Sequence, residues 1–400
     1  MTKLKDITGK ALSGEWGTDD ETGVGIPVLR TTNFTNEGIV NYENVVTRII
    51  TKKDISEKYL QSGDIIIEKS GGSDKQPVGR VIYFDGPENT YLFNNFTGLL
   101  RVRDKNEWFP RYVFYSLFAN YKKGGTRPFE NKTTGLHNLK TDDYVSRYEI
   151  TEIPLNKQID ICAQLDQILK VINLRRKELS NLDDLIKARF VEMFGDPAIN
   201  PMNWDKVNIS EVVGGKISNG FFAKRDDYAD DGNVSVMGVA YVVNRMYSQW
   251  QDLPKTNGTD KDIEKFEVKY GDMLFCRSSL VAEGIGKASI VPEGVPNNTL
   301  FECHVIRFPL DLNKCVPEYM QVLSTTEFFR QQIIAQSKTA TMTTIGQDGI
   351  LKADIILPPL EKQKEFYAFV KQVDKSKATV QKALDETQLL FDSLMQQYFG

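Results

Sequence analysis

Two stretches of this chain repeat each other at a constant distance. Residues 154–195 recur as residues 359–400, which is a shift of 205 positions (359 minus 154). Proline, leucine, lysine and glutamine return at matching places near the start of each copy, and both copies end in Phe-Gly. A long internal repeat restricts the chain to folds that are built from two similar halves.

Each copy is predicted to form one long helix. Apolar residues return at alternating spacings of four and three, from Ile161 to Met193 and again from Phe366 to Tyr398. Two unrelated amphipathic helices in separate cores are the alternative, but they would have no reason to share one register over their whole length. The two helices are therefore expected to pair with each other as an intramolecular antiparallel coiled coil.

The shared register predicts which residues of the two helices face each other. The expected pairs are Leu165 with Leu394, Ile168 with Phe391, Leu179 with Val380, and Ile186 with Val373. Arg175 and Arg189 interrupt the apolar seam of the first copy, as Lys377 and Thr387 do in the second. The aliphatic stems of both arginines are expected to pack while their guanidinium groups reach water.

The segments between the helices also correspond. GDIIIEKSGG is matched by GDMLFCRSSL, and FPRYVFYSL by VPEYMQVLS, at nearly the same shift. The predicted fold class is therefore α+β, with two globular α/β halves, two long helices and an internal pseudo-two-fold repeat. The expected domains are residues 1–152, a helix over 153–195, a second half over 196–356 that begins with a linker at 196–205, and a helix over 357–400.

The composition of the chain does not indicate a particular ligand. Net charge is −4, no apolar run is long enough to span a membrane, and the start lacks the apolar core of a signal peptide, so a cytoplasmic location is expected. Four irregularly spaced cysteines indicate neither a disulfide framework nor a zinc ribbon. Cys303, His304 and Cys315 suggest a metal site only weakly, because neighbouring residues of a strand point to opposite faces. No bound metal is predicted.

Enzymatic motifs are missing from the sequence. No GxxxxGK[ST] phosphate loop is present, and FGDPAINP only superficially matches the Asn/Asp-Pro-Pro-aromatic motif of adenine methyltransferases. Asp64 and Glu68 could suggest a nuclease cluster, but the second half has Asp272 with Cys276 and thus no second carboxylate. No catalytic residue is predicted.

Both halves contain a strand that is expected to end in a cationic loop with small polar residues. Such loops can bind phosphates or the edges of bases, although any one of them alone is more typical of a solvated turn. The candidate DNA-binding residues are Thr31, Thr32, Asn33, Lys69, Ser70, Gly71, Gly72, Lys75, Arg80, Lys123, Arg127, Lys224, Arg225, Arg277, Ser278, Ser279, Lys287, Lys338, Thr339 and Thr341.

These features together resemble the specificity subunit of type I restriction-modification enzymes. The resemblance rests on the doubled Gly-Asp strands at Gly63 and Gly271, the Pro-x-Tyr helices at Pro110 and Pro317, and the Lys-Gln pairs after the prolines that begin the repeat. The family usually has Glu-Gln at that last position, so the capping of the two helices is the detail that this departure affects.

The resemblance implies a non-catalytic DNA-binding subunit. In this family two target-recognition domains each read one half of a bipartite DNA sequence, and the helices space them and dock two methyltransferase subunits, which restriction subunits join. S-adenosylmethionine, ATP and magnesium would then belong to the partners, whose assembled complex is a site-specific deoxyribonuclease and adenine methyltransferase. A tandem scaffold for another ligand, or a self-sufficient methyltransferase or nuclease, are the alternative functions.

Overall fold

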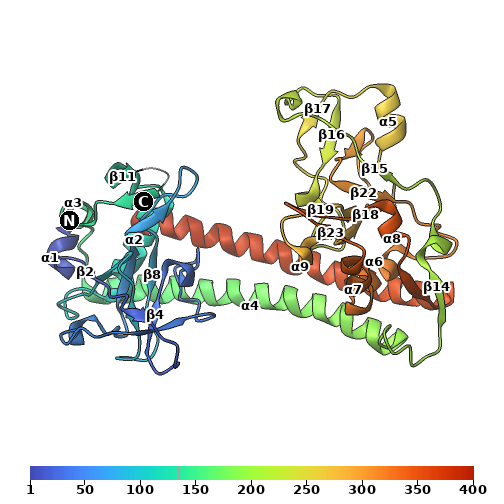
Figure 1. Ribbon diagram of the computed structural model, residues 1–400. Coiled ribbons are helices and arrows are strands. Elements are labelled where there is room, and N and C mark those ends of the chain that lie inside the picture. The colour runs from blue at the N-terminus through green and yellow to red at the C-terminus, as the bar shows by residue number, and fades with distance from the viewer. Residues whose placement is uncertain (134–135) are drawn as a thin grey trace. The chain divides into compact units, whose positions relative to one another are not determined.

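The computed structural model describes residues 1–133 and 136–400. The chain divides into two compact units (Figure 1). Unit 1 contains Met1–Arg176 together with Lys382–Gly400, and unit 2 contains Lys177–Gln381. Each unit therefore consists of one globular part and one half of each long helix. Within the described residues, no helix is long and apolar enough to cross a membrane.

The repeated stretches form two helices of 40 residues each, α4 (Leu155–Phe194) and α9 (Leu360–Phe399). The first half of α4 shares unit 1 with the second half of α9, and the remaining halves share unit 2. Within each unit the two helices therefore run antiparallel, as the repeat predicted.

Contacts across the helix pair of unit 1 agree with the predicted register. Leu165 and Phe391 belong to one core cluster, with Ile168 and Leu394 packed against it. Arg175 differs from the expectation, because its guanidinium group does not simply reach water: it donates hydrogen bonds to the carbonyl oxygen of Ala383 and to the hydroxyl of Thr387. Arg175 and Thr387, one interruption from each apolar seam, thus meet and bond to each other.

In unit 2 the helix pair also follows the predicted register. Ile186 and Val373 lie in the same core cluster, as predicted. The rings of Phe190 and Phe366 stack edge to face with their centroids 5.7 Å apart. Lys377, which also interrupts the apolar seam of α9, donates a 2.6 Å hydrogen bond to Asp183 on the facing helix. Apolar and charged layers both fix the register.

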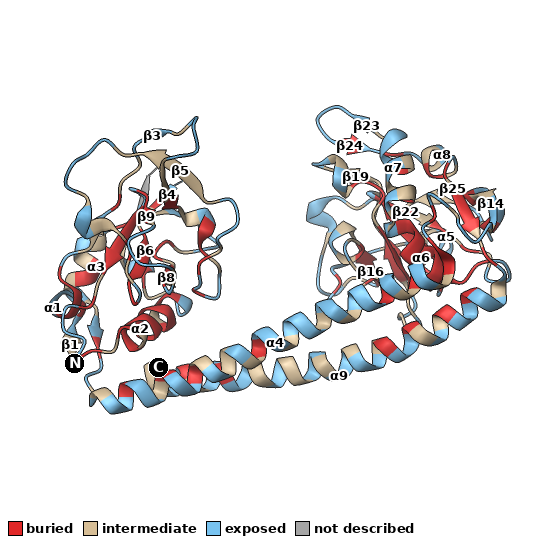
Figure 2. Cartoon of the chain, turned by 90° about the horizontal axis from the view of Figure 1, so that it is seen from below, coloured by how far each residue is buried: buried red, intermediate tan, exposed pale blue. Residues whose placement is uncertain are grey.

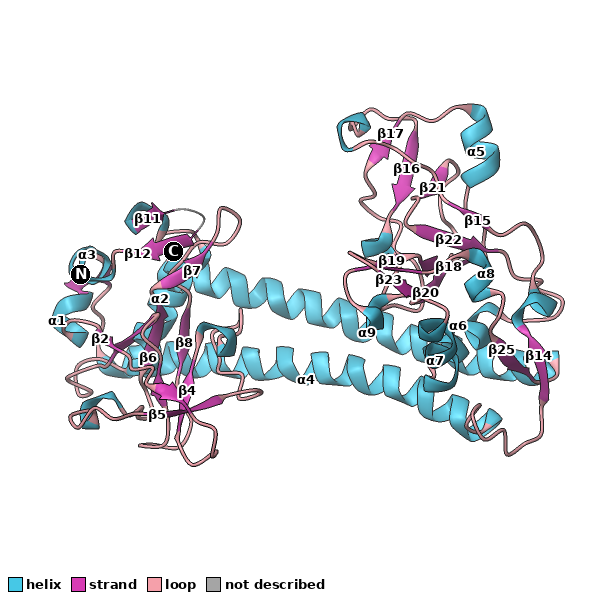
Figure 3. Ribbon diagram, in the orientation of Figure 1, coloured by secondary structure: helices cyan, strands magenta, loops and turns pink. Residues whose placement is uncertain are grey.

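The globular part of unit 1 consists of small sheets, antiparallel except where β4 pairs with β9, and of short helices (Figure 3). The helices are α1 (Leu4–Thr8), α2 (Pro110–Lys122) and α3 (Thr141–Arg147). The strands are β1 (Thr2–Lys3), β2 (Leu12–Ser13), β3 (Thr18–Asp19), β4 (Ile26–Leu29), β5 (Val46–Ile49), β6 (Ile65–Glu68), β7 (Ser70–Gly72), β8 (Val81–Tyr83), β9 (Leu92–Phe93), β10 (Thr97–Leu100), β11 (Glu130–Thr133), β12 (Leu136–Leu139) and β13 (Glu149–Ile150).

Unit 2 repeats this plan. Its helices are α5 (Asp260–Phe266), α6 (Pro317–Thr325), α7 (Glu327–Ala335) and α8 (Gln347–Ile350). Its strands are β14 (Asp205–Asn208), β15 (Ser218–Asn219), β16 (Val234–Met237), β17 (Lys255–Thr256), β18 (Met273–Cys276), β19 (Ser278–Ser279), β20 (Ala288–Ile290), β21 (Thr299–Phe301), β22 (Val305–Phe308), β23 (Lys338–Thr339), β24 (Thr343–Thr344) and β25 (Asp354–Leu357).

The central sheets of the two units correspond strand by strand. The central sheet has the order β2-β10-β6-β8 in unit 1 and β15-β22-β18-β20 in unit 2. Its strands β6 (Figure 2) and β18 are fully buried, which explains why residues 65–67 and 273–276 are all apolar. A three-stranded sheet, β11-β12-β7 or β23-β24-β19, continues from each middle strand. The internal repeat thus extends from sequence to topology.

A buried glutamine at the start of each long helix explains the Lys-Gln motif. Gln158 accepts a 2.8 Å hydrogen bond from the backbone N–H of Phe109, just before α2, and donates to the carbonyl oxygens of Glu107 and Ile153, both at 2.9 Å. Gln363 makes the same three kinds of bond in unit 2. Lys157, the residue that departs from the usual Glu-Gln, is exposed. The departure therefore does not affect the bonds that Gln158 makes.

The tyrosine of each Pro-x-Tyr helix forms the second link between the globular part and the long helix. Tyr112 donates a 3.0 Å hydrogen bond to the carbonyl oxygen of Thr151, and Tyr319 donates a 2.8 Å bond to that of Ile356. Both acceptors lie in the short segment that leads into a long helix. Each globular part is therefore tied to its half of the helix pair by equivalent buried polar bonds.

Candidate nucleic-acid interface

The predicted cationic loop of each unit is held as part of a strand. Lys69 lies between β6 and β7, and its backbone N–H and carbonyl bond to Phe96 and Leu139, both at 2.8 Å. Arg277 occupies the same place between β18 and β19 and bonds to His304 and Ile345 at 2.8 and 3.0 Å. The expected free loop was therefore wrong, because the chain continues at once into a second sheet. The two cations have fixed positions.

In unit 2 the second sheet brings together candidate residues that are far apart in sequence. Ser278 and Ser279 pair with β24, and β24 pairs with Lys338 and Thr339 of β23. Lys338 and Thr339 are exposed, as is Thr341 in the turn that follows. This sheet together with Arg277 is called the recognition sheet of unit 2. It presents a cation, hydroxyls and a second cation on one small surface.

The recognition sheet of unit 1 is β11-β12-β7 together with Lys69. Ser70 and Gly72 pair with β12, and Gly72 lies so close to the backbone of Val78 that a larger residue would collide with it. Gly71 has a φ of +136° and is exposed. The ammonium group of Lys69 donates a 3.0 Å hydrogen bond to the hydroxyl of Ser13, and burial lowers its pKa. Lys69 is thus less available than Arg277.

Arg127 and Lys75 border the same sheet. Arg127 donates to the carbonyl oxygen of Asp74 at 3.3 and 3.4 Å, so it connects η3 (Arg127–Phe129) to the turn that follows β7. Lys75 lies in that turn and is exposed. These two cations remain candidates for a ligand on the unit 1 surface.

Some candidate residues have internal roles. Arg80 donates to the carbonyl oxygens of Thr31 and Phe34 at 2.8 and 3.0 Å and pairs with the buried Glu68 at 3.3 Å. Asn33 is buried, accepts a 3.0 Å bond from the N–H of Arg30, and donates to two carbonyl oxygens. These bonds hold η1, a short 3-10 helix over residues 31–33, against the central sheet. Arg80 and Asn33 therefore stabilise the fold.

The other candidates are dispersed. Thr32, Lys224 and Arg225 are exposed, the last two at η5 (Arg225–Asp227). Lys123 donates a 3.0 Å bond to the carbonyl oxygen of Phe399, which places a cation at the C-terminus of α9, where the helix dipole favours one. Lys287 donates a 2.7 Å bond to the amide oxygen of Asn244.

The acidic residues of the doubled Gly-Asp strands do not form a nuclease cluster. Asp64 accepts two 2.7 Å hydrogen bonds from the guanidinium group of Arg101 and one from the N–H of Gln61. In unit 2, Asp272 lies 4.0 Å from Arg307. Neither arginine was among the predicted site residues, although their matching positions in the repeat were a usable signal. They neutralise the buried aspartates that begin β6 and β18.

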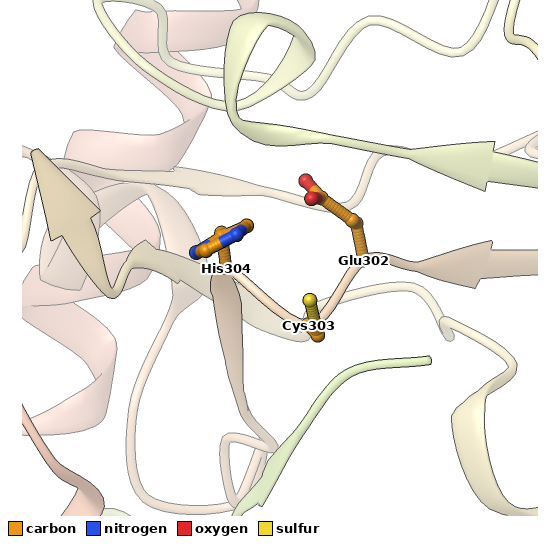
Figure 4. Close-up of side chains that lie close together, drawn as sticks. All are labelled: Glu302, Cys303 and His304. Carbon is orange, nitrogen blue, oxygen red and sulfur yellow. The ribbon is translucent and has the colours of Figure 1, made fainter. Parts of the chain in front are cut away.

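One group of potential metal ligands lies beside the recognition sheet of unit 2. The donor atoms of Glu302, Cys303 and His304 lie within 4.8 Å of one another (Figure 4). Neighbouring side chains were expected to point to opposite faces of a strand. That expectation was wrong, because this segment forms a turn between β21 and β22. Cys315 is buried and takes no part. The group offers a soft thiol, an imidazole and a carboxylate, but Nδ1 of His304 is already bonded to the hydroxyl of Ser278 at 3.1 Å.

Each unit also contains a groove between its globular part and its helix pair. The groove of unit 1 has a volume of about 550 Å³ and that of unit 2 about 640 Å³. Their linings correspond in the repeat: Phe118 and Glu37 in unit 1 stand where Thr325 and Arg245 stand in unit 2. The grooves are equivalent in position but differ in charge.

Comparison with known proteins identifies the class of this chain. The family model for the type I restriction modification DNA specificity domain matches residues 1–183 and again residues 201–387. The chain belongs to this family, and the two matches coincide with the two copies of its internal repeat.

One relative with a similar sequence is also described as a specificity subunit. In an alignment of 213 positions that covers 50% of this chain, the chain is 24% identical to the type I restriction enzyme MjaX specificity subunit of Methanocaldococcus jannaschii. The match spans 46% of that protein, or about half its length.

Solved structures share the fold over the entire chain. The S subunit of a type I restriction-modification system from M. genitalium matches 100% of this chain and 95% of its own, with a TM-score of 0.52 and 12% identity. A chain from a study of complex assembly and conformational transition in a type I R-M system gives a TM-score of 0.54 and 15% identity, and covers 100% and 96%. The predicted fold class is thereby confirmed.

Proposed function

We propose that this chain is the sequence-specific DNA-binding subunit of a type I restriction-modification complex, and that each unit reads one half of a bipartite target. One observation carries this proposal: both units hold a cation at the same place, between a buried strand and a small sheet. Lys69 and Arg277 are fixed there by equivalent backbone bonds. A base-reading side chain needs such a rigid support, since direct readout depends on geometry.

The two recognition sheets should read different bases. Arg277 presents a guanidinium fork that can bond the O6 and N7 atoms of guanine in a bidentate manner, and hydroxyl residues lie beside it. Lys69 is a single ammonium group, already bonded to Ser13 and followed by Ser70 and two glycines. The shared frame with different side chains supports one target sequence per unit.

Catalysis is assigned to partner subunits. We propose that two methyltransferase subunits supply adenine methylation with S-adenosylmethionine, and that restriction subunits supply ATP- and magnesium-dependent translocation and cleavage. The complex would act in the cytoplasm. The chain alone should therefore transfer no methyl group to DNA when it is given S-adenosylmethionine.

An electrophoretic mobility shift with the co-purified methyltransferase, at two salt concentrations, tests the proposal. Binding should be specific for the methylated motif of the host and should weaken steeply with salt, by a slope that corresponds to several phosphate contacts. Binding that is absent, or insensitive to salt, would favour a scaffold for another ligand. Methyl transfer by the chain alone would favour a self-sufficient methyltransferase.

A further inference from the structure

The groove of unit 2 is bordered by an unusual number of cations. It lies between the segment 244–246, the start of β20, the end of α6, and the parts of α4 and α9 that belong to this unit. Its charged lining residues are Asp183, Lys187, Arg245, Lys287, Arg330 and Lys377. We call this surface the cationic groove.

Only part of this charge is neutralised within the protein. Lys377 pairs with Asp183 at 2.6 Å, and Lys187 pairs with Asp184 at 3.2 Å. In the part of the chain that the structure describes, the remaining three cations of the lining form no ion pair with a carboxylate. They are Arg245, Lys287 and Arg330.

These three cations are instead positioned by neutral oxygen atoms. Arg245 donates a 2.6 Å bond to the side chain of Gln249, and Lys287 donates a 2.7 Å bond to Asn244. Arg330 donates a 3.1 Å bond to the carbonyl oxygen of Glu283. Neutral acceptors orient a cation without cancelling its charge, so the groove keeps a positive potential that an anion would complement.

Arg330 carries the strongest sign of an absent ligand. Its Nη1 atom is buried and has no hydrogen-bond partner among the described residues. A buried N–H group without an acceptor is costly and rare in folded proteins. Burial also lowers the pKa of this guanidinium group. An anion in the groove would be attracted by the charge of this guanidinium group, which no carboxylate of the described residues pairs with.

One backbone hydrogen bond links the cationic groove to the strand that leads into the recognition sheet. The carbonyl oxygen of Lys287 accepts a 2.8 Å bond from the N–H of Cys276, which immediately precedes Arg277. Lys287, which lines the groove, is therefore bonded to the residue just before Arg277, the predicted base-reading cation. Double-stranded DNA carries a phosphate charge about every 1.7 Å of its axis, so a duplex that extends from the recognition sheet toward the groove would place phosphates against it.

We propose that the cationic groove binds backbone phosphates of DNA next to the half-site that unit 2 reads. The inference rests on the proposed DNA-binding function and deepens it, because it assigns Arg245, Lys287 and Arg330 to contacts that carry no sequence information. Guanidinium groups suit this role, since their fork matches two phosphate oxygens. Such contacts set the register and the affinity of a specific protein on DNA.

The equivalent groove of unit 1 has no such excess of charge. Arg176 faces Glu37 at 3.6 Å, and Asp392 also lines the groove. Lys123 is bonded to the end of α9, and Lys122 lies 5.3 Å from the ring centroid of Phe118. The remaining lining is largely apolar. This groove is expected to make no phosphate contact, and it provides an internal control.

Salt-dependent binding of the chain with its co-purified methyltransferase tests the inference. In the double variant Arg245→Gln/Lys287→Gln, the slope of log Kobs against log salt should fall by about 2, roughly one for each lost phosphate contact. Affinity should fall by the same factor, at least several-fold, on specific and on random DNA. Arg245→Lys with Lys287→Arg should keep the wild-type slope, because charge is retained.

Two controls make the test decisive. Lys122→Gln in the unit 1 groove should leave the slope unchanged, and thermal unfolding of each variant checks that unit 2 is folded. A wild-type slope in the folded double variant would overturn the phosphate inference while leaving the proposed function intact. Wild-type DNA binding with loss of the co-purifying methyltransferase would identify the groove as a protein-docking surface and also overturn it. If the wild-type complex binds no DNA, the proposed function itself fails.

Discussion

The two units share a framework but differ where α2 or α6 packs on a long helix. Arg111 in α2 and Glu318 in α6 occupy the same position of the repeat, and so do Asp166 in α4 and Lys371 in α9. The charges of the pair are thus exchanged between the units. The framework depends on features found in both copies, whereas this contact is specific to each.

In unit 1 the contact is fully paired. Arg111 donates to Asp166 at 2.7 and 2.9 Å, and Tyr115 donates to the same carboxylate. The guanidinium carbon of Arg111 also lies 4.5 Å from the ring centroid of Tyr83. A planar cation between rings and bonded to a carboxylate is a stabilising arrangement.

In unit 2 the contact contains two carboxyl groups, those of Glu318 and Asp374, and too few donors for both. The single hydroxyl of Tyr247 lies 3.3 Å from Glu318 and 3.1 Å from Asp374, although it can donate only one hydrogen bond. Oε2 of Glu318 is buried without a partner among the described residues. Burial raises the pKa of both carboxyl groups, and Lys371 opposes this only in part for Glu318. The comparison shows that the same backbone arrangement can contain a stabilising ion pair in one unit and two carboxyl groups that share one hydroxyl in the other.

The largest expected effect comes from exchanging an entire half. Replacing residues 1–152 with the same half of a relative should change one half-site of the methylated motif and keep the other half-site and the gap. Adding one helical turn of residues to both α4 and α9 should do the opposite and lengthen the gap. Methylome sequencing of cells that carry each variant reads both outcomes. A swap that changed both half-sites would contradict one target sequence per unit.

Breaking the buried glutamine anchor should have the largest effect on stability. Gln158→Leu leaves the N–H of Phe109 and two carbonyl oxygens without partners, so it should lower the free energy of unfolding by about 3 kcal/mol. Gln363→Leu should cost a similar amount in unit 2. Lys157→Ala, at an exposed neighbour, should change stability by less than about 0.5 kcal/mol. Denaturant unfolding measures all three, and a cost for the lysine equal to that of the glutamine would refute the anchor.

The same residues show what a sequence can and cannot predict. The repeat, its apolar spacing and the Pro-x-Tyr motifs were enough for the fold class and the helix register, because periodicity reports which faces are buried. The motif glutamines were visible, but two of the three backbone partners of each lie about 50 residues away. Arg80 was misjudged for a related reason: a cation beside a glycine suggests an exposed loop, and only the tertiary fold brings it to Glu68.

A smaller effect is expected from the two base-reading candidates. Arg277→Ala should weaken binding of specific DNA by about 1 to 3 kcal/mol and affect random DNA less, if the guanidinium makes a bidentate base contact. Lys69→Ala should cost less than Arg277→Ala, because Lys69 is half-buried and bonded to Ser13. Quantitative shift assays on both DNA types distinguish the cases. Equal losses on specific and random DNA would reassign Arg277 to phosphate binding.

A stabilising change is expected at Glu318. Its ordinary pKa of 4.5 is raised in the folded state by burial, so the protonated form stabilises unit 2 below about pH 4.5 and this contribution is lost as pH rises through the folded-state pKa. Glu318→Gln should therefore raise the stability of unit 2 by about 1 kcal/mol at pH 8 and change it little at pH 4. Glu361→Gln, at an exposed position, serves as the control. Thermal unfolding at both pH values measures the effect, and destabilisation at pH 8 would show that Tyr247 and Lys371 satisfy the charge.

The smallest expected effect is that of metal removal on DNA binding. Glu302, Cys303 and His304 supply three donor atoms, but the guanidinium group of Arg277 reaches the carbonyl oxygen of Cys303 at 3.4 Å, and a nearby cation disfavours a second positive charge. Burial also raises the pKa of the Cys303 thiol, so the thiolate that a soft metal requires is scarce at neutral pH. Dialysis against EDTA should therefore leave the affinity of the chain for its DNA unchanged, and Cys303→Ser should behave like the wild type. A loss of affinity that added Zn²⁺ restores in the wild type but not in Cys303→Ser would instead make this turn a metal-dependent part of the unit 2 recognition surface, with no equivalent required in unit 1.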